Sequence, residues 1–170
     1  RTGTGAAATV TGVGFAPDLA VITGRNADYS STWFDRLRGS YRFVISNSTQ
    51  AELIQVNTLT SFDQDGVSLS NSAYVNESPA PYINHFFRRA PGFMDVVCYS
   101  GTGVAGTVPH NLAAMPELVV IKMRNRPSDW YVWSKNDGVT PKSLLLNSSA
   151  TAAAVDAMAY VSANMSSVNI

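Results

Sequence analysis

Residues 16–22, Ala-Pro-Asp-Leu-Ala-Val-Ile, return later in the chain as residues 115–121, Met-Pro-Glu-Leu-Val-Val-Ile. In both stretches a proline precedes an acidic residue and a short apolar run, and Pro116 follows Pro17 by 99 positions. Further matches flank this pair at offsets of 98 to 101: Gly3-Thr4-Gly5 with Gly101-Thr102-Gly103, Thr9-Val10 with Thr107-Val108, Asn47-Ser48 with Asn147-Ser148, and Val67 with Val168. Single-residue insertions in loops between fixed elements produce such a drift. The sequence therefore predicts tandem repeats of about 100 residues.

The apolar residues occur in short runs that are rich in β-branched and aromatic side chains, as in β-strands. Turn residues, mostly Pro, Gly, Asn and Ser, separate these runs. The expected strands are Leu19–Ile22, Tyr41–Ile45, Tyr82–Phe87, Phe93–Tyr99, Leu118–Lys122 and Ser143–Leu146. With about seven short strands a unit and no crossover helices, the pattern predicts an all-β fold of tandem antiparallel β-sandwiches.

One stretch in each copy favours a short helix or a helical turn instead. Ser148 to Met158 is rich in alanine, and its first-copy counterpart, Ser48 to Ile54, also begins with a hydroxyl residue that can cap a helix.

The two expected domains are residues 1–90 and residues 91–170. The first copy lacks a counterpart of Phe93–Tyr99, and the second lacks a counterpart of Tyr82–Phe87. A sheet without such a strand leaves backbone groups at its edge that template pairing with another chain. We therefore expect either a longer repeat protein, or a homo-oligomer in which neighbouring subunits fill these places.

The composition excludes several classes of partner. Twelve basic and twelve acidic residues give a formal net charge of zero, which provides no long-range attraction to nucleic acid or anionic lipid. No apolar run approaches the length of a membrane span, and no signal segment is visible. The only cysteine, Cys98, lies in an apolar run, where we expect it to be buried.

Long motifs in both copies resemble one known repeat. They are Tyr99–Gly103, Val108–Leu112, Met115–Asn125, Trp130–Trp133 and Leu144–Asn147 in the second copy, and Trp33–Gly39 and Ser61–Leu69 in the first. Together they are similar to a repeat of tail-fibre-like and other virion structural proteins of tailed bacteriophages. The resemblance implies a jelly-roll or concanavalin-like β-sandwich, a place in the virion and a scaffold role, and it brings no catalytic residues.

The acidic residues do not form a glycosidase pair, which needs two carboxylates about 5–10 Å apart. The one acidic pair two residues apart is Asp63 and Asp65, followed by Gly66. This spacing resembles the start of a calcium loop, yet the second copy keeps neither carboxylate. A hairpin turn is favoured over a cation site.

The two histidines, His85 and His110, have no ligand at metal-binding spacing. His110 follows Pro109 at a strand end, where a neutral imidazole would bond to the backbone of the turn. No Gly-x-Ser-x-Gly elbow is present. We expect neither a metal nor a cofactor, and no enzymatic activity.

Aromatic residues are the candidate ligand-binding side chains. Trp130 and Tyr131 alternate along one expected strand, and Trp33 lies in the matching first-copy stretch. An aromatic is shared at the position of Phe34 and Trp133, which favours the core there. Trp130 is not shared and is the better candidate for an exposed ring that stacks on a sugar, although core or interface packing is the favoured interpretation of these aromatic residues.

Three functions compete, and an enzyme is the least favoured of them. The favoured one is a structural component of a phage virion, in a tail fibre, tail or capsid surface, whose partners are other virion proteins and copies of itself. The alternative is a receptor- or carbohydrate-binding module for host attachment, through Trp130, Tyr131 and Trp33.

Overall fold

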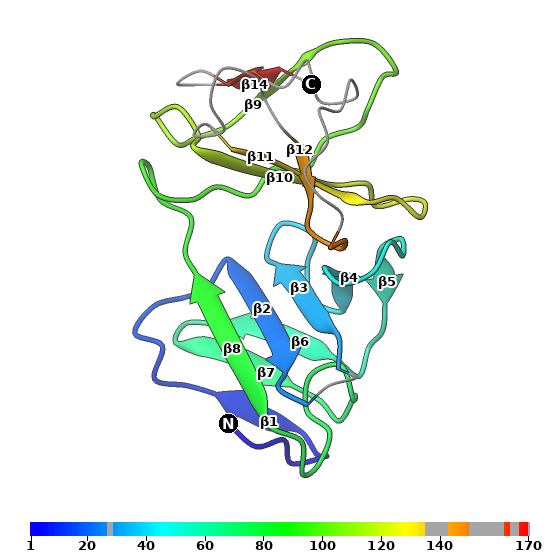
Figure 1. The fold of residues 1–170 in the computed structure, drawn as a ribbon. Coiled ribbons are helices and arrows are strands. Elements are labelled where there is room, and N and C mark those ends of the chain that lie inside the picture. Colours follow the sequence, from blue (N-terminus) through cyan, green and yellow to red (C-terminus); the bar gives the residue numbers. More distant parts are fainter. Residues whose placement is uncertain (27–28, 135–142, 150–161, 164–166, 170) are drawn as a thin grey trace. The chain divides into compact units, whose positions relative to one another are not determined.

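The computed structural model describes residues 1–26, 29–134, 143–149, 162–163 and 167–169. Within these residues every regular element is a β-strand, and every pair of strands is antiparallel. The all-β antiparallel fold predicted from the sequence is confirmed. The chain divides into two compact units (Figure 1), Arg1–Arg88 with Arg124–Pro127, and Arg89–Met123 with Ser128–Ile170.

The first unit is built from two sheets. A five-stranded sheet has the order β5-β4-β3-β2-β8, and a three-stranded sheet has the order β1-β7-β6. The strands are β1 (Ala8–Val10), β2 (Leu19–Gly24), β3 (Ser31–Asp35), β4 (Arg42–Ile45), β5 (Leu53–Ile54), β6 (Leu59–Asp63), β7 (Gly66–Leu69) and β8 (Tyr82–Phe87).

Side chains from both sheets of the first unit meet in one hydrophobic core, which makes this unit a β-sandwich. Phe34 of β3 and Phe43 of β4 are fully buried there, with ring centroids 5.1 Å apart. The other core residues are Ala20, Ile22, Ile45, Leu59, Val67, Leu69, Val75, Ala80 and Tyr82.

The second unit also has two sheets, each with three strands among the described residues. One has the order β10-β11-β12 and the other the order β13-β14-β9. The strands are β9 (Thr107–Pro109), β10 (Leu118–Lys122), β11 (Trp130–Ser134), β12 (Ser143–Leu145), β13 (Ser162–Ala163) and β14 (Ser167–Asn169).

Strand pairing follows the same pattern in the two units. Leu19 pairs with Asp35 as Leu118 pairs with Ser134, and Trp33 pairs with Val44 as Val132 pairs with Leu144. The other sheets also correspond: Val10↔Val67 matches Val108↔Val168, and Ser61↔Ser68 matches Ser162↔Asn169. Strands that match in sequence therefore also match in pairing partner and register, including Leu19–Ile22 and Leu118–Ile121.

The expected strand Phe93–Tyr99 is wrong, because only Met94 makes a bridge there, to Ala90. Within this stretch the Asp95 carboxylate accepts the N–H of Val96, and it also accepts the N–H of Asn111 from the turn after β9. The first of these bonds engages a backbone donor of the stretch with a side chain in place of a strand ladder. The expected burial of Cys98 is also wrong, since Cys98 is exposed.

The helix expected at Ser48–Ile54 is wrong as well. The Ser48 hydroxyl accepts the N–H of Gln50 in a local turn, and Leu53–Ile54 then pairs with β4 as strand β5. In the second copy, residues 150–158 of the expected helix lie outside the described residues. The described part of the chain contains no helix, and hence no helix that crosses a membrane.

Candidate functional site

A groove of about 190 Å³ opens in the second unit and is a candidate for a binding site. Its lining comes from three segments that fold together: the extended residues before β9, the end of β9 with its following turn, and β10. The lining residues are Asp95, Val97, Tyr99, Val108, Pro109, His110, Leu112, Pro116, Leu118, Val119, Val120, Ile121 and Lys122.

The groove follows the edge of strand β10 rather than one of its faces. All five residues of the strand, Leu118–Lys122, line it. Consecutive residues of a strand point to opposite faces of a sheet, so a groove over one face would meet only alternate residues. A groove that meets all five must run beside the backbone.

Asp95 fixes one wall of the groove. Its Oδ2 accepts the N–H of Asn111 at 2.8 Å, its Oδ1 accepts the N–H of Val96 at 2.9 Å, and it forms an ion pair with Arg89. Burial raises the pKa of Asp95, but the hydrogen bonds from Asn111 and Arg89 outweigh burial and hold that pKa below its usual value. The carboxylate is therefore ionised and holds the loop, a role that suits a structural group better than a general acid.

Three other polar side chains line the groove. Burial lowers the pKa of Lys122, against the opposing charge of Asp129, and burial raises the pKa of Tyr99. The Lys122 ammonium donates to the carbonyl of Met123 at 2.7 Å. His110 Nδ1 accepts the N–H of Leu112 at 3.2 Å, which confirms the predicted bond between this imidazole and its turn.

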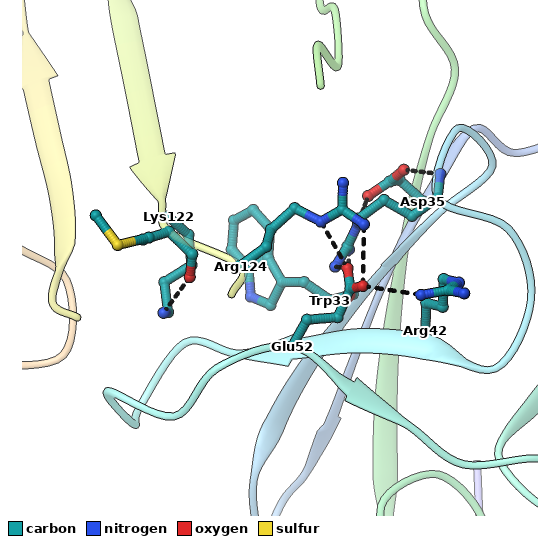
Figure 2. A network of polar contacts seen from close by, with 8 residues as sticks. Trp33, Asp35, Arg42, Glu52, Lys122 and Arg124 are labelled. Atoms are coloured by element: carbon teal, nitrogen blue, oxygen red, sulfur yellow. Dashed lines mark hydrogen bonds and ion pairs between the residues drawn. The ribbon is translucent and has the colours of Figure 1, made fainter. Parts of the chain in front are cut away.

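A second polar cluster lies in the first unit around Glu52, just before β5 (Figure 2). Its Oε2 accepts from Arg38 at 3.2 Å and from Arg124 at 2.8 Å, while its Oε1 accepts from Arg42 at 3.3 Å and from Arg124 at 2.9 Å. Asp35 forms an ion pair with the same buried Arg38. Burial raises the pKa of Glu52, and the bonds from Arg124 and Arg38 more than reverse this, so that the pKa is lowered.

The Glu52 cluster is saturated by its own contacts. Each carboxylate oxygen accepts from two guanidinium groups, and the backbone N–H of Glu52 donates to the carbonyl of Arg124 at 2.8 Å. Such an arrangement ties loops to the sheet rather than presenting a charge to a substrate. Sequence reasoning missed it because Glu52 and Arg124 lie 72 positions apart.

The aromatic site predicted from the sequence is not formed as expected. Trp130 is only 3% exposed, so the favoured interpretation, core packing, is confirmed for this residue, and the alternative of an exposed ring is wrong. It lies at the start of β11, and its backbone N–H donates to the side-chain oxygen Oδ1 of Asn147 at 2.7 Å. Tyr131 on β11 and Trp33 on β3 are half-buried. Sugar binding through these two side chains stays a prediction.

The aromatic position shared by the two copies is buried in both, as predicted. Phe34 is 0% exposed and Trp133 is 7% exposed. This position belongs to the interior, which leaves it outside any binding surface.

The predicted hairpin at Asp63 to Gly66 is confirmed. Asp63 pairs with Gly66, so Gln64 and Asp65 form the two-residue turn between β6 and β7. Asp63 accepts the hydroxyls of Ser61 and Ser68, whereas Asp65 accepts the N–H groups of Gly12 and Gly14. The two carboxylates thus serve different partners. Among the described residues, no three His, Cys, Asp or Glu side chains gather in a metal-binding group.

The groove residues were not among the predicted site residues. Asp95 lies in no motif, and the motifs that contain Tyr99 and Lys122 assign these side chains no role. The three residues meet because the segment before β9 passes close to β10.

The fold and the groove define an all-β module of antiparallel sheets with a groove along a strand edge. Comparison with protein families identifies the family of this module. The chain belongs to the family described as a domain of unknown function, DUF7483, whose model matches residues 1–170. No curated protein and no solved structure matches the chain. The resemblance to phage virion repeats stays a prediction.

Proposed function

We propose that the chain is a structural and interaction module of a tailed-phage virion, and that it acts as a β-sandwich scaffold rather than as an enzyme. The observation that carries this proposal is the pairing of equivalent strands in equivalent registers in the two units. Repetition of one unit along a chain is typical of proteins that extend a structure by stacking or by serial linkage. The motifs that resemble virion repeats span both copies.

The use of charge in the structure supports the same proposal. Glu52, Asp65 and Asp95 have lowered pKa values and accept hydrogen bonds from arginines or from backbone N–H groups. A general acid at neutral pH needs a raised pKa and access to a substrate. These carboxylates instead fix loops and turns, as a scaffold requires.

The proposal places the chain in assembled particles, in contact with other virion proteins and with copies of itself. The test is gold-labelled antibody against the full chain, applied to gradient-purified particles from a culture that produces it and viewed by negative-stain electron microscopy. We expect gold at one fixed position on each particle, and the chain among the particle proteins. Recovery of the chain only in fractions without particles would overturn the proposal.

A further inference from the structure

The turn between β10 and β11 belongs to a different unit from the strands that it joins. The two strands pair with each other in the second unit, from Leu118 opposite Ser134 to Lys122 opposite Trp130. Residues Arg124–Pro127, in the turn between them, belong to the compact first unit instead. The turn is therefore attached at both of its ends to a hairpin of the second unit, while its middle is part of the fold of the first.

The first unit holds this turn at Glu52. The Glu52 carboxylate accepts from Arg124 Nε at 2.8 Å and from Arg124 Nη2 at 2.9 Å, while the backbone N–H of Glu52 donates to the Arg124 carbonyl at 2.8 Å. Figure 2 shows the Arg124 guanidinium pointing toward this carboxylate. The Glu52 side chain is only 8% exposed, and bidentate bonds between arginine and a carboxylate are among the strong hydrogen bonds of proteins.

The matching turn of the first copy is held differently. Arg25 follows β2 as Arg124 follows β10, and it is the counterpart of Arg124 in the sequence repeat. Arg25 is exposed, and its backbone N–H donates to the carbonyl of Pro81. A hairpin of this type therefore forms without a bond from its turn arginine to Glu52. The bond that Arg124 makes is an additional tie, rather than a requirement of the hairpin.

We propose that residues 124–127 act as a clasp, through which the Glu52 site of the first unit stabilises the β10–β11 hairpin of the second. Closing a hairpin costs conformational entropy for each residue of its loop. The bonds to Glu52 order this loop and so offset part of that cost. Because such coupling is reciprocal, the closed hairpin also presents Arg124 to Glu52 and stabilises the first unit. This inference does not depend on the proposed virion location.

The test is hydrogen exchange of the β10 and β11 amides in the full chain with the change Glu52→Gln. These amides should exchange about tenfold faster, with the largest change next to the turn, near Lys122 and Trp130, because a bidentate charged contact to the loop is lost. Unchanged exchange in β10 and β11 would overturn the proposal.

Two variants of the first unit are controls for this experiment. Glu77→Gln changes an exposed carboxylate that accepts one bond, from Tyr29, and Val67→Ala removes methyl groups from the buried core of the first unit without touching the clasp. Both should leave exchange in β10 and β11 within about twofold. Acceleration by Val67→Ala equal to that by Glu52→Gln would assign the effect to general loss of stability in the first unit and would overturn the clasp.

The change Arg124→Ala removes the same contact from the side of the turn. It should accelerate the same amides by a similar factor, and the double variant Glu52→Gln with Arg124→Ala should exchange no faster than either single variant. Arg25→Ala, the matched change in the first-copy turn, should stay within about twofold. Effects that multiply in the double variant would show that Glu52 and Arg124 act separately, which would contradict the proposal even if each single variant loosens the hairpin.

Discussion

Asp65 and Gly66 hold the β6–β7 turn against the segment that follows β1. Asp65 accepts the N–H of Gly12 at 2.9 Å and that of Gly14 at 2.6 Å. Gly66 has a φ of 149°, and a Cβ there would lie 1.8 Å from the carbonyl oxygen of Val10. At this scale, single side chains, or the lack of one, determine how closely two backbone segments approach.

Gly66→Ser should destabilise the protein by about 1–3 kcal/mol, because the new side chain meets the Val10 backbone and L-residues disfavour this φ. Gly101→Ser is the matched control, since Gly101 has no positive φ and a Cβ added there would have no neighbour within 4 Å. Urea unfolding followed by circular dichroism measures both. Equal midpoints for the two variants would contradict the close approach at Gly66.

Asp65→Asn should lower the melting temperature, because the amide has one acceptor oxygen for the two N–H donors of Gly12 and Gly14. Asp63→Asn is a control two residues away. Asp63 accepts from the hydroxyls of Ser61 and Ser68, and a hydroxyl can rotate to accept from the new amide. Differential scanning calorimetry should show the larger decrease for Asp65→Asn, and the reverse order would contradict this account.

At the scale of elements, the sequence predicted strands wherever apolar runs were bounded by turn residues. Tyr82–Phe87 and Leu118–Lys122 are strands with the predicted bounds. The repeat offset also correctly identified β2 and β10 as equivalent strands of the two units. Phe93–Tyr99 does not form a strand, and within it the Asp95 carboxylate accepts the N–H of Val96, a bond that no apolar pattern reveals. The sequence could not decide whether the Trp130 ring is exposed, because alternation along a strand shows only which residues share a face of the sheet. Tertiary packing determines which face is buried, and it buries Trp130.

The Glu52 cluster belongs to the same scale, because it links the β3–β4 loop and β4 to the residue before β5. Glu52→Gln should cost about 1–3 kcal/mol, since one amide oxygen replaces two charged acceptors and the amide N–H groups face guanidinium donors. Urea unfolding measures the loss.

Glu77→Gln is the control for this change. Glu77 is exposed and accepts one bond, from the Tyr29 hydroxyl, which an amide oxygen can also accept. A shift of equal size in the two variants would refute a structural role for the Glu52 cluster.

At the scale of the whole molecule, both units depend on ionised carboxylates. The folded-state pKa values of Glu52, Asp65 and Asp95 are lowered, so their stabilising contribution is present above the unfolded values, about 4.3 for Glu and 3.9 for Asp. That contribution is lost as the pH falls through the lower folded pKa values.

The melting temperature should therefore be nearly constant from about pH 7 to pH 5 and should fall steeply below about pH 4. Calorimetry across this range, on the wild-type chain and on a Glu52→Gln, Asp65→Asn double variant, measures the effect. The variant should show a shallower acid decrease, since two of the three groups no longer titrate. Parallel curves would assign acid unfolding to other groups.

The exposed Cys98 gives this molecule an intrinsic attachment point for a reporter. It is the only cysteine of the chain, and its two neighbours, Val97 and Tyr99, both line the groove beside β10. An environment-sensitive dye coupled to its thiol through a maleimide would occupy a single defined place, with no engineered residue. Occupation of the groove then becomes a change in fluorescence that can be followed in real time.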